Sequence, residues 1–265
     1  MICSGKGRER VKTVKVRNVI IGEGIPKICV PIFERTEEEI LSEAKHVASL
    51  EPDVVEFRAD RFENYCEHDS IRNVLAGLRD ILGEIPLLFT LRTKDEGGEA
   101  EVGRTVYADL IVKACESGLV DMADVEVLRQ DDAETIIEAA HSFGVIVVAS
   151  HHDFEKTPTK DEILKDLKEM QKTSADVLKI AVMPQGIGDV KVLMEAAEEM
   201  VNEHADRPVI AISMSEKGTV SRIAAEAFGS AMTFGAASKA SAPGQIGVEE
   251  LRESLEDFHE TMEAE

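Results

Sequence analysis

The feature that most constrains the fold is a regular alternation of short apolar runs with longer amphipathic segments, repeated eight times along the chain. Most of the apolar runs are rich in Val, Ile or Leu, as expected for parallel strands that helices cover on the outside. We expect strands at residues 27–32, 53–58, 86–92, 120–127, 144–150, 175–182, 208–214 and 231–235. We expect helices at 36–50, 69–82, 98–117, 131–143, 160–173, 188–204, 217–229 and 247–265.

Eight strand–helix units in a chain of 265 residues favour an α/β fold of the (β/α)8 TIM barrel type over an open sheet. Residues 12–24, ahead of the first unit, read KTVKVRNVIIGEG, which predicts an N-terminal β-hairpin that plugs the N-terminal end of the barrel. The composition does not shift along the chain. We therefore expect a single catalytic domain over residues 11–265, preceded by a flexible N-terminal extension over residues 1–10.

The charge balance excludes several partners. The chain has 52 acidic and 30 basic side chains and a net charge of -22, so its surface repels nucleic acid and anionic membranes. Such a surface is typical of ordinary solubility or of adaptation to a salty cytoplasm. No apolar run approaches the ~20 residues of a membrane span. The four cysteines lack paired spacing, which argues against a metal site and fits a cytoplasmic protein.

One lysine stands inside an expected strand. In the run DVLKIAVM, alternation places Lys179 on the same face as Val177 and Ala181, and the bulkier aliphatic residues on the other face. The bulky side suits contact with helices, so Lys179 should point into the barrel. Burial opposes the charge of a lysine, and the alternative interpretation is a structural lysine that is paired with a carboxylate.

Further polar residues gather where barrel active sites form, at the C-terminal ends of the strands. The fifth strand delivers His151 and His152, and only one of them should face the site because adjacent strand residues point to opposite sides. The other residues of this group are Glu56 and Arg58 on the second strand, Arg92 at the end of the third, and Arg222 after the seventh.

These residue types together indicate a chemistry. A neutral buried lysine attacks ketones and aldehydes to form an imine, which acidifies the protons of the neighbouring carbon. A histidine is a suitable base for such a proton, and arginine binds carboxylates through a two-pronged contact. The pattern predicts proton abstraction next to the carbonyl of an acidic substrate. It does not separate a dehydratase from an aldolase.

Several longer motifs resemble the type I 3-dehydroquinate dehydratase family, and the likeness extends from about residue 12 to the end. The runs that carry it are EFRAD, LFTLRTKDEGGE, SGLVDMADVE, SHHDFEKTP, LKIAVMPQ, SMSEKGTVSR and FGSAMTFGAASKASAPGQI. The resemblance implies conversion of 3-dehydroquinate to 3-dehydroshikimate and water in the shikimate pathway of aromatic amino acid biosynthesis. It also implies a homodimer that needs no metal or organic cofactor.

The resemblance assigns the roles residue by residue. It makes Lys179 the imine-forming residue, His152 the general acid/base and Glu96 the acid that orients His152. His151 departs from the usual family pattern and competes with His152 as the base. The residues implied for substrate binding are Glu56, Arg58 and Arg92 for the hydroxyls, Arg222 for the carboxylate, Ser241 and Gln245 from the loop after the last strand, and Met214 and Phe234 as pocket lining.

Two other functions stay open on the residues alone. A class I aldolase also places an imine lysine on a barrel strand and usually holds phosphorylated sugars in a glycine-rich cup. The runs Gly235-Ala-Ala-Ser and Ala242-Pro-Gly could form such a cup. A non-catalytic metabolite-binding barrel is the third candidate. The retained lysine and histidine speak against it.

Overall fold

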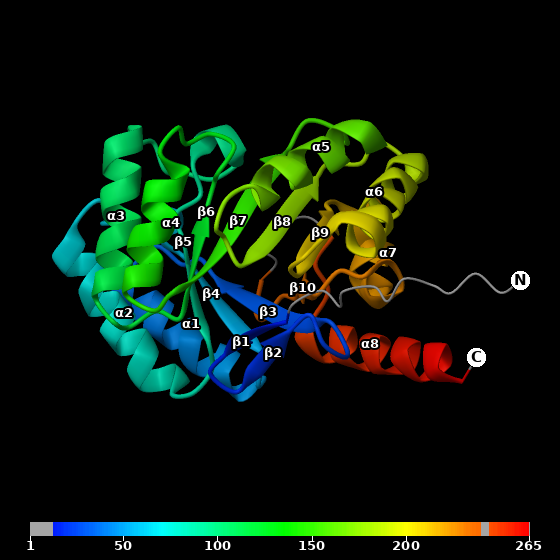
Figure 1. Cartoon of the computed structure of the whole chain (residues 1–265). Coiled ribbons are helices and arrows are strands. Elements are labelled where there is room, and N and C mark those ends of the chain that lie inside the picture. The colour runs from blue at the N-terminus through cyan, green and yellow to red at the C-terminus, as the bar shows by residue number, and fades with distance from the viewer. Residues whose placement is uncertain (1–12, 240–243, 265) are drawn as a thin grey trace, which may run out of the picture.

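The strands of the computed structural model form a nearly closed parallel barrel with helices around it (Figure 1). The structure describes residues 13–239 and 244–264, and the predicted extension over residues 1–10 lies outside them. Within the described residues, the barrel sheet has eight strands in the order β10-β3-β4-β5-β6-β7-β8-β9. The strands are β3 (Lys27–Ile32), β4 (Val54–Arg58), β5 (Leu87–Thr90), β6 (Met122–Val125), β7 (Ile146–Asp153), β8 (Val177–Val182), β9 (Val209–Ser213) and β10 (Met232–Phe234).

The barrel closes between β9 and β10, the two ends of the strand order. A parallel bridge joins Val209 and Ser230, and the backbone N–H of Ala231 donates to the carbonyl of Val209 at 2.8 Å. The α-helices that follow the strands are α1 (Glu37–Ser49), α2 (His68–Leu82), α3 (Arg104–Glu116), α4 (Ala133–Ser142), α5 (Lys160–Gln171), α6 (Ile187–Glu199), α7 (Thr219–Ile223) and α8 (Val248–Glu263). Each predicted strand–helix unit is therefore present. Among the described residues, no helix is both long and apolar enough to cross a bilayer.

The N-terminal hairpin is confirmed. Strands β1 (Val14–Val16) and β2 (Val19–Ile21) pair antiparallel. The fully buried side chain of Ile21 packs with the inward-facing residues of the barrel, while Arg17 reaches Asp121, ahead of β6, at 2.6 Å. The hairpin therefore covers one end of the barrel and leaves the other end, where the strands terminate, for the site.

Alternation along the strands divides the core into two layers. The inner layer fills the barrel and includes Val177 and Ala181 of β8. The outer layer lies between strands and helices and includes Leu178, Ile180 and Val182 of the same strand. The predicted inward orientation of Lys179 follows from this division, because Lys179 lies between Val177 and Ala181 in the alternation.

The helix predicted at 98–117 was wrong in its first turns, because α3 begins only at Arg104. Gly97 has a φ of 78°, and a Cβ on Gly98 would lie 2.1 Å from the carbonyl oxygen of Arg92. The chain folds there as a tight loop around the short 3-10 helix η2 (Lys94–Glu96). This loop brings Glu96 back into the barrel.

Two other predicted helices are interrupted, and one strand is longer than predicted. The helix predicted at 217–229 is divided into the 3-10 helix η4 (Glu216–Gly218), α7 and the 3-10 helix η5 (Ala225–Phe228). The helix predicted at 188–204 changes at its end into a π-helix, η3 (Met200–His204). A further 3-10 turn, η1 (Ala59–Arg61), follows β4. Strand β7 continues to Asp153, so both histidines are strand residues.

Candidate active site

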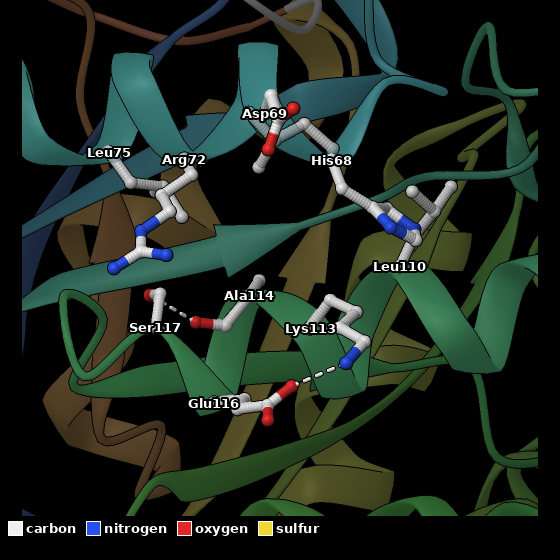
Figure 2. Close-up of a pocket in the computed structure, with 10 residues that line it drawn as sticks. His68, Asp69, Arg72, Leu75, Leu110, Lys113, Ala114, Glu116 and Ser117 are labelled. Carbon is white, nitrogen blue, oxygen red and sulfur yellow. Dashed lines mark hydrogen bonds and ion pairs between the residues drawn. The ribbon is translucent and has the colours of Figure 1, made fainter.

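A pocket opens inside the barrel where the strands end. All the predicted site residues that the structure describes line it: Glu56, Arg58, Arg92, Glu96, His152, Lys179, Met214, Arg222, Phe234 and Gln245. Ser241 lies outside the described residues. The sequence prediction did not name Phe154, Ala181 and Ile212, which also line the pocket. A separate groove between α2 and α3 contains none of the predicted site residues (Figure 2).

Lys179 points into this pocket from β8 and is 5% exposed. Its Nζ lies 3.7 Å from Oδ2 of Asp124 and 3.9 Å from Oε1 of Glu56. It also lies 4.5 Å from the centre of the Phe234 ring. Lys179 therefore faces the pocket, as expected of a reactive lysine, and is also paired with carboxylates, as expected of a structural lysine. The two interpretations of the sequence are compatible. A positive charge formed at this nitrogen would be stabilised by both carboxylates.

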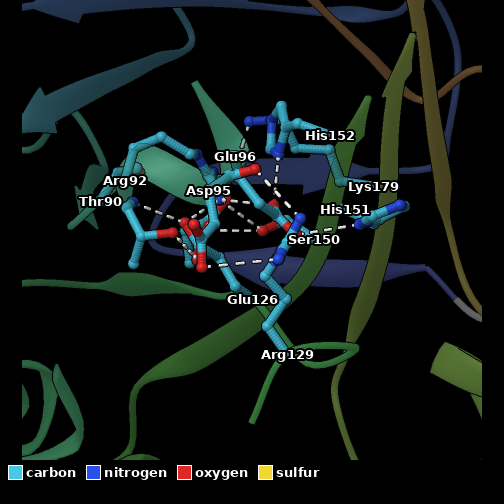
Figure 3. Close-up of polar contacts among 12 residues, drawn as sticks. Thr90, Arg92, Asp95, Glu96, Glu126, Arg129, Ser150, His151, His152 and Lys179 are labelled. Carbon is cyan, nitrogen blue, oxygen red and sulfur yellow. Dashed lines mark hydrogen bonds and ion pairs between the residues drawn. The ribbon is translucent and has the colours of Figure 1, made fainter. Parts of the chain in front are cut away.

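Arg92 organises the floor of the pocket and is 3% exposed. Its guanidinium donates to Asp124 at 2.8 Å, to Glu126 at 2.9 Å and to the hydroxyl of Ser150 at 3.0 Å. Figure 3 shows Arg92, Glu126 and Ser150 within this network. Buried charges need such partners because desolvation is costly. Much of the hydrogen-bonding capacity of Arg92 is therefore used within the protein, although its side chain also lines the pocket.

The pKa values of two acids in this network, Asp124 and Glu126, change in opposite directions. Burial alone would raise the pKa of Asp124, but Arg92 and Lys179 outweigh it and hold that pKa below its ordinary value. Burial wins at Glu126, and the pKa of this carboxyl is raised despite Arg92. The sequence analysis missed both acids. An aspartate within the apolar run of β6, in phase with the inward Met122, was the signal that could have identified Asp124.

Glu96 is fully buried and lies between two histidines. Its Oε2 is 3.0 Å from Nδ1 of His152, and its Oε1 is 2.9 Å from Nδ1 of His151. Burial opposes ionisation of Glu96, but the hydrogen bonds from both histidines outweigh it and hold the pKa well below the ordinary value. Because the ionised carboxylate of Glu96 can only accept a hydrogen bond, Nδ1 of His152 carries the proton and donates it to this bond. The other ring nitrogen, Nε2, is left as the proton acceptor.

The two histidines differ in exposure and in charge. Burial, followed by the nearby Arg92, lowers the pKa of His152 to about 3, so its ring is neutral near pH 7. At His151 burial lowers the pKa, but the hydrogen bond to Glu96 outweighs burial and the net pKa is raised. Only His152 lines the pocket. This agrees with the expectation that only one of the two histidines faces the site, although both contact Glu96.

Glu56 and Arg58 share the inward face of β4, but their side chains are held by different partners. Thr90 donates to Glu56 at 2.8 Å. Arg58 makes a two-pronged contact with Asp60, with distances of 2.8 and 2.9 Å. Asp60 is 2% exposed and was not singled out in the sequence. Its contact fixes the direction of the Arg58 guanidinium at the rim of the pocket.

Arg222 reaches the pocket from α7 and is 2% exposed. Its Nη1 donates to the carbonyl of Phe234 at 3.3 Å, and burial lowers its pKa to about 10. The close approach of Gly218 to Ser213 fixes α7 against the end of β9, since a Cβ on Gly218 would lie 2.1 Å from the Ser213 carbonyl oxygen. A guanidinium fork in this position suits a carboxylate.

Fold and side chains together define a class of protein. A (β/α)8 barrel with an inward lysine and a histidine–glutamate pair at the strand ends is an enzyme scaffold for lysine-dependent chemistry on carbonyl substrates. A family model described as type I 3-dehydroquinase matches residues 28–262. The chain belongs to this family of hydro-lyases, which convert 3-dehydroquinate to 3-dehydroshikimate and water in the shikimate pathway.

Individual relatives agree with the family assignment. The 3-dehydroquinate dehydratase of Bacillus velezensis is 45% identical over 253 residues, which cover 95% of this chain and 100% of the relative. That of Salmonella typhimurium is 45% identical over 251 residues, covering 94% and 100%. The solved type I 3-dehydroquinate dehydratase of Clostridium difficile superposes with a TM-score of 0.91 at 46% identity, covering 94% of this chain and 98% of the other. Membership of this family decides against the aldolase and the non-catalytic barrel.

Proposed function

We propose that the dehydration proceeds through an imine between Lys179 and the ring ketone of 3-dehydroquinate, with His152 as the general acid/base. One observation carries the proposal: Lys179 and a neutral His152 line the same pocket, and an ionised Glu96 fixes Nδ1 of His152. The C. difficile relative was solved with covalently modified comenic acid, which supports a covalent step in this family.

The proposed steps balance as follows. Lys179 first gives up a proton, and its amine attacks the ketone carbon. The resulting carbinolamine takes up a proton and loses water, which leaves a protonated imine. Nε2 of His152 takes a proton from the neighbouring carbon, and the electron pair moves to the imine nitrogen. When the electrons return, the hydroxyl on the next carbon leaves and takes the proton from His152 to form water. A water molecule then hydrolyses the conjugated protonated imine, which releases 3-dehydroshikimate and restores Lys179 in its protonated form.

The remaining residues would bind and orient the substrate. The carboxylates of Glu56 and Asp124 beside Nζ would stabilise the positive charge of the protonated imine. Arg222 would bind the substrate carboxylate. The residues proposed for the hydroxyls and the ring are Glu56, Arg58 and Arg92 for hydroxyl contacts, Met214 and Phe234 for the ring faces, and Ser241 and Gln245 from the loop after β10.

We also propose that residues 11–265 act as one catalytic domain in a cytoplasmic homodimer that uses no metal or organic cofactor. The family resemblance supports the dimer and the absence of a cofactor. The scattered cysteines support a reducing compartment.

The experiment combines turnover with trapping. The protein is mixed with 3-dehydroquinate, and the conjugated enone absorbance of the product is followed. Borohydride is then added, and the adduct is located by peptide mass spectrometry. We expect the adduct on Lys179 and no turnover in Lys179→Ala. The exposed Lys217, which donates to the carbonyl of Gln185 at 2.9 Å, provides a matched control, and Lys217→Ala should be active and trapped at Lys179. An adduct on another lysine refutes the assignment.

A further inference from the structure

The contact between Glu96 and His151 is not used by the proposed mechanism. The two oxygens of Glu96 are divided between neighbouring residues of one strand, at 2.9 Å to His151 and 3.0 Å to His152 (Figure 3). Alternation sends the two rings to opposite sides of β7. They meet again at one carboxylate because η2 packs beside this strand end and carries Glu96 between them.

The environment of His151 differs from that of His152. The His151 side chain is 20% exposed and does not line the pocket, so it can exchange protons with solvent while substrate is bound. The charged groups around it are Glu96 from η2, Arg129 from the loop before α4, and Asp166 from α5. Nε of Arg129 also lies 3.5 Å from Oε1 of Glu96, on the oxygen that His151 contacts.

We propose that His151 is a positioning residue that holds one oxygen of Glu96 and adjusts, through its own protonation, how strongly Glu96 supports His152 as the base. This inference rests on the proposed function, because it takes His152 as the residue that removes the proton. It gives a second histidine a defined part in the reaction without contact with substrate.

The electrostatic argument has a definite sign. His152 becomes positively charged when it takes the proton, and the negative charge of Glu96 stabilises that state. A protonated His151 offsets part of the Glu96 charge. A neutral His151 leaves the full negative charge of Glu96 to stabilise protonated His152. Turnover should therefore rise with pH as His151 loses its proton, and then reach a plateau.

The two histidines titrate in separate ranges, which makes the effect measurable. Burial lowers the pKa of His151, but the hydrogen bond to Glu96 outweighs it, so the pKa of His151 lies above its ordinary value. The pKa of His152 is about 3 in the free protein, so His152 stays neutral where His151 titrates. We therefore assign an acidic limb of the kcat profile, above the titration range of His152, to His151.

The first test replaces His151 by residues that keep or lose the contact. In His151→Asn the amide can still donate to Glu96 but does not titrate. We expect a kcat near the wild-type plateau and loss of the acidic limb that we assign to His151. His151→Ala loses the contact, and we expect kcat to fall about 10-fold, as for the loss of one hydrogen bond to a charged group. KM should stay within about twofold, because substrate contacts are unchanged.

His141 provides a matched control, since it is a partly buried histidine on α4 that pairs with Asp176 at 2.9 Å. His141→Asn should retain both the rate and the limb. A second variant, Asp166→Asn, leaves Glu96 and both histidines in place and removes a negative neighbour of His151. It should move the limb to lower pH without changing the plateau.

The outcomes separate this inference from the proposed function. Borohydride trapping at Lys179 in His151→Asn should equal that in the wild type. If trapping is intact but His151→Asn keeps the wild-type limb, or if Asp166→Asn does not move it, the inference is refuted. A loss of rate in His151→Asn as large as in His152→Asn would make His151 the base and would also overturn it. If the wild-type protein forms no adduct at Lys179, the proposed function itself fails.

Discussion

Replacement of Arg92 by methionine should destabilise the fold far more than loss of an ordinary surface arginine. Methionine keeps most of the apolar stem and removes the charged head. The change removes the guanidinium that Asp124 and Glu126 contact at 2.8 and 2.9 Å, and leaves Asp124 with only the more distant Lys179, at 3.7 Å, as an ion-pair partner. Asp124 is 1% exposed and Glu126 is 0% exposed, so the two carboxylates have little access to water.

The expected magnitude follows from this burial. Removing one partner of a buried ion pair costs about 3–5 kcal/mol, because an uncompensated charge remains inside the protein. For a domain of this size, 1 kcal/mol corresponds to roughly 2–4 °C in Tm, so Arg92→Met should melt roughly 6–20 °C below the wild type. The control is Arg35→Met, because Arg35 pairs with Glu99 at 3.0 Å while its side chain is 63% exposed. That pair should contribute less than about 1 kcal/mol.

The effect should depend on pH with a predictable sign. In the wild type the pKa of Asp124 is lowered, so its contribution to stability is present above the ordinary carboxyl range and is lost as the pH falls through the folded-state pKa. In Arg92→Met the orphaned carboxylates take up protons at higher pH. The difference between variant and wild type should therefore be largest near pH 7 and should shrink toward pH 4.

Urea unfolding followed by circular dichroism at pH 7 and at pH 4–5 measures these differences, and equal m values would confirm that the same surface is exposed. A loss at pH 7 no larger than that of Arg35→Met would show that Arg92 is not the centre of a buried network. A difference that grows at low pH would contradict the electrostatic argument.

Three further predictions concern binding, the hairpin and the thiols. Arg222→Lys keeps the charge but loses the fork, so KM for 3-dehydroquinate in steady-state assays should rise about 10-fold or more, and an unchanged KM would exclude the carboxylate role. Asp121→Asn weakens contacts of 2.6 Å to both Arg17 and Arg79, so urea unfolding should show a loss of about 1–3 kcal/mol, whereas a loss below the error of the fit would show that these two ion pairs do not stabilise the fold. Burial raises the pKa of the Cys115 thiol to about 12, so a maleimide should label the exposed Cys66 long before Cys115 in the folded protein, and equal rates by mass spectrometry would contradict the burial of Cys115.

The order and type of the elements could be read from the sequence because they depend on local periodicity. A period of two fixes which strand residues share a face, so the inward direction of Lys179 needed no knowledge of the rest of the chain. The same rule placed Glu56, Arg58 and Arg92 on the inner side near the strand ends. Family motifs then added Glu96, which no periodicity would have selected, because it lies in a loop.

What only the tertiary structure decided is which charged groups meet. Arg92 and Asp124 are 32 positions apart, and their contact at 2.8 Å depends on how the neighbouring strands are staggered around the barrel. The loop after β5 is set by Gly97, which has a positive φ, and by Gly98, which packs closely on Arg92. This loop delays the start of the predicted helix to Arg104 and directs Glu96 inward. The sharing of Glu96 by His151 and His152 follows from that loop, since alternation along β7 alone sends the two rings apart. Periodicity is a property of one segment, whereas these contacts are distances between segments, and only the closed barrel determines them.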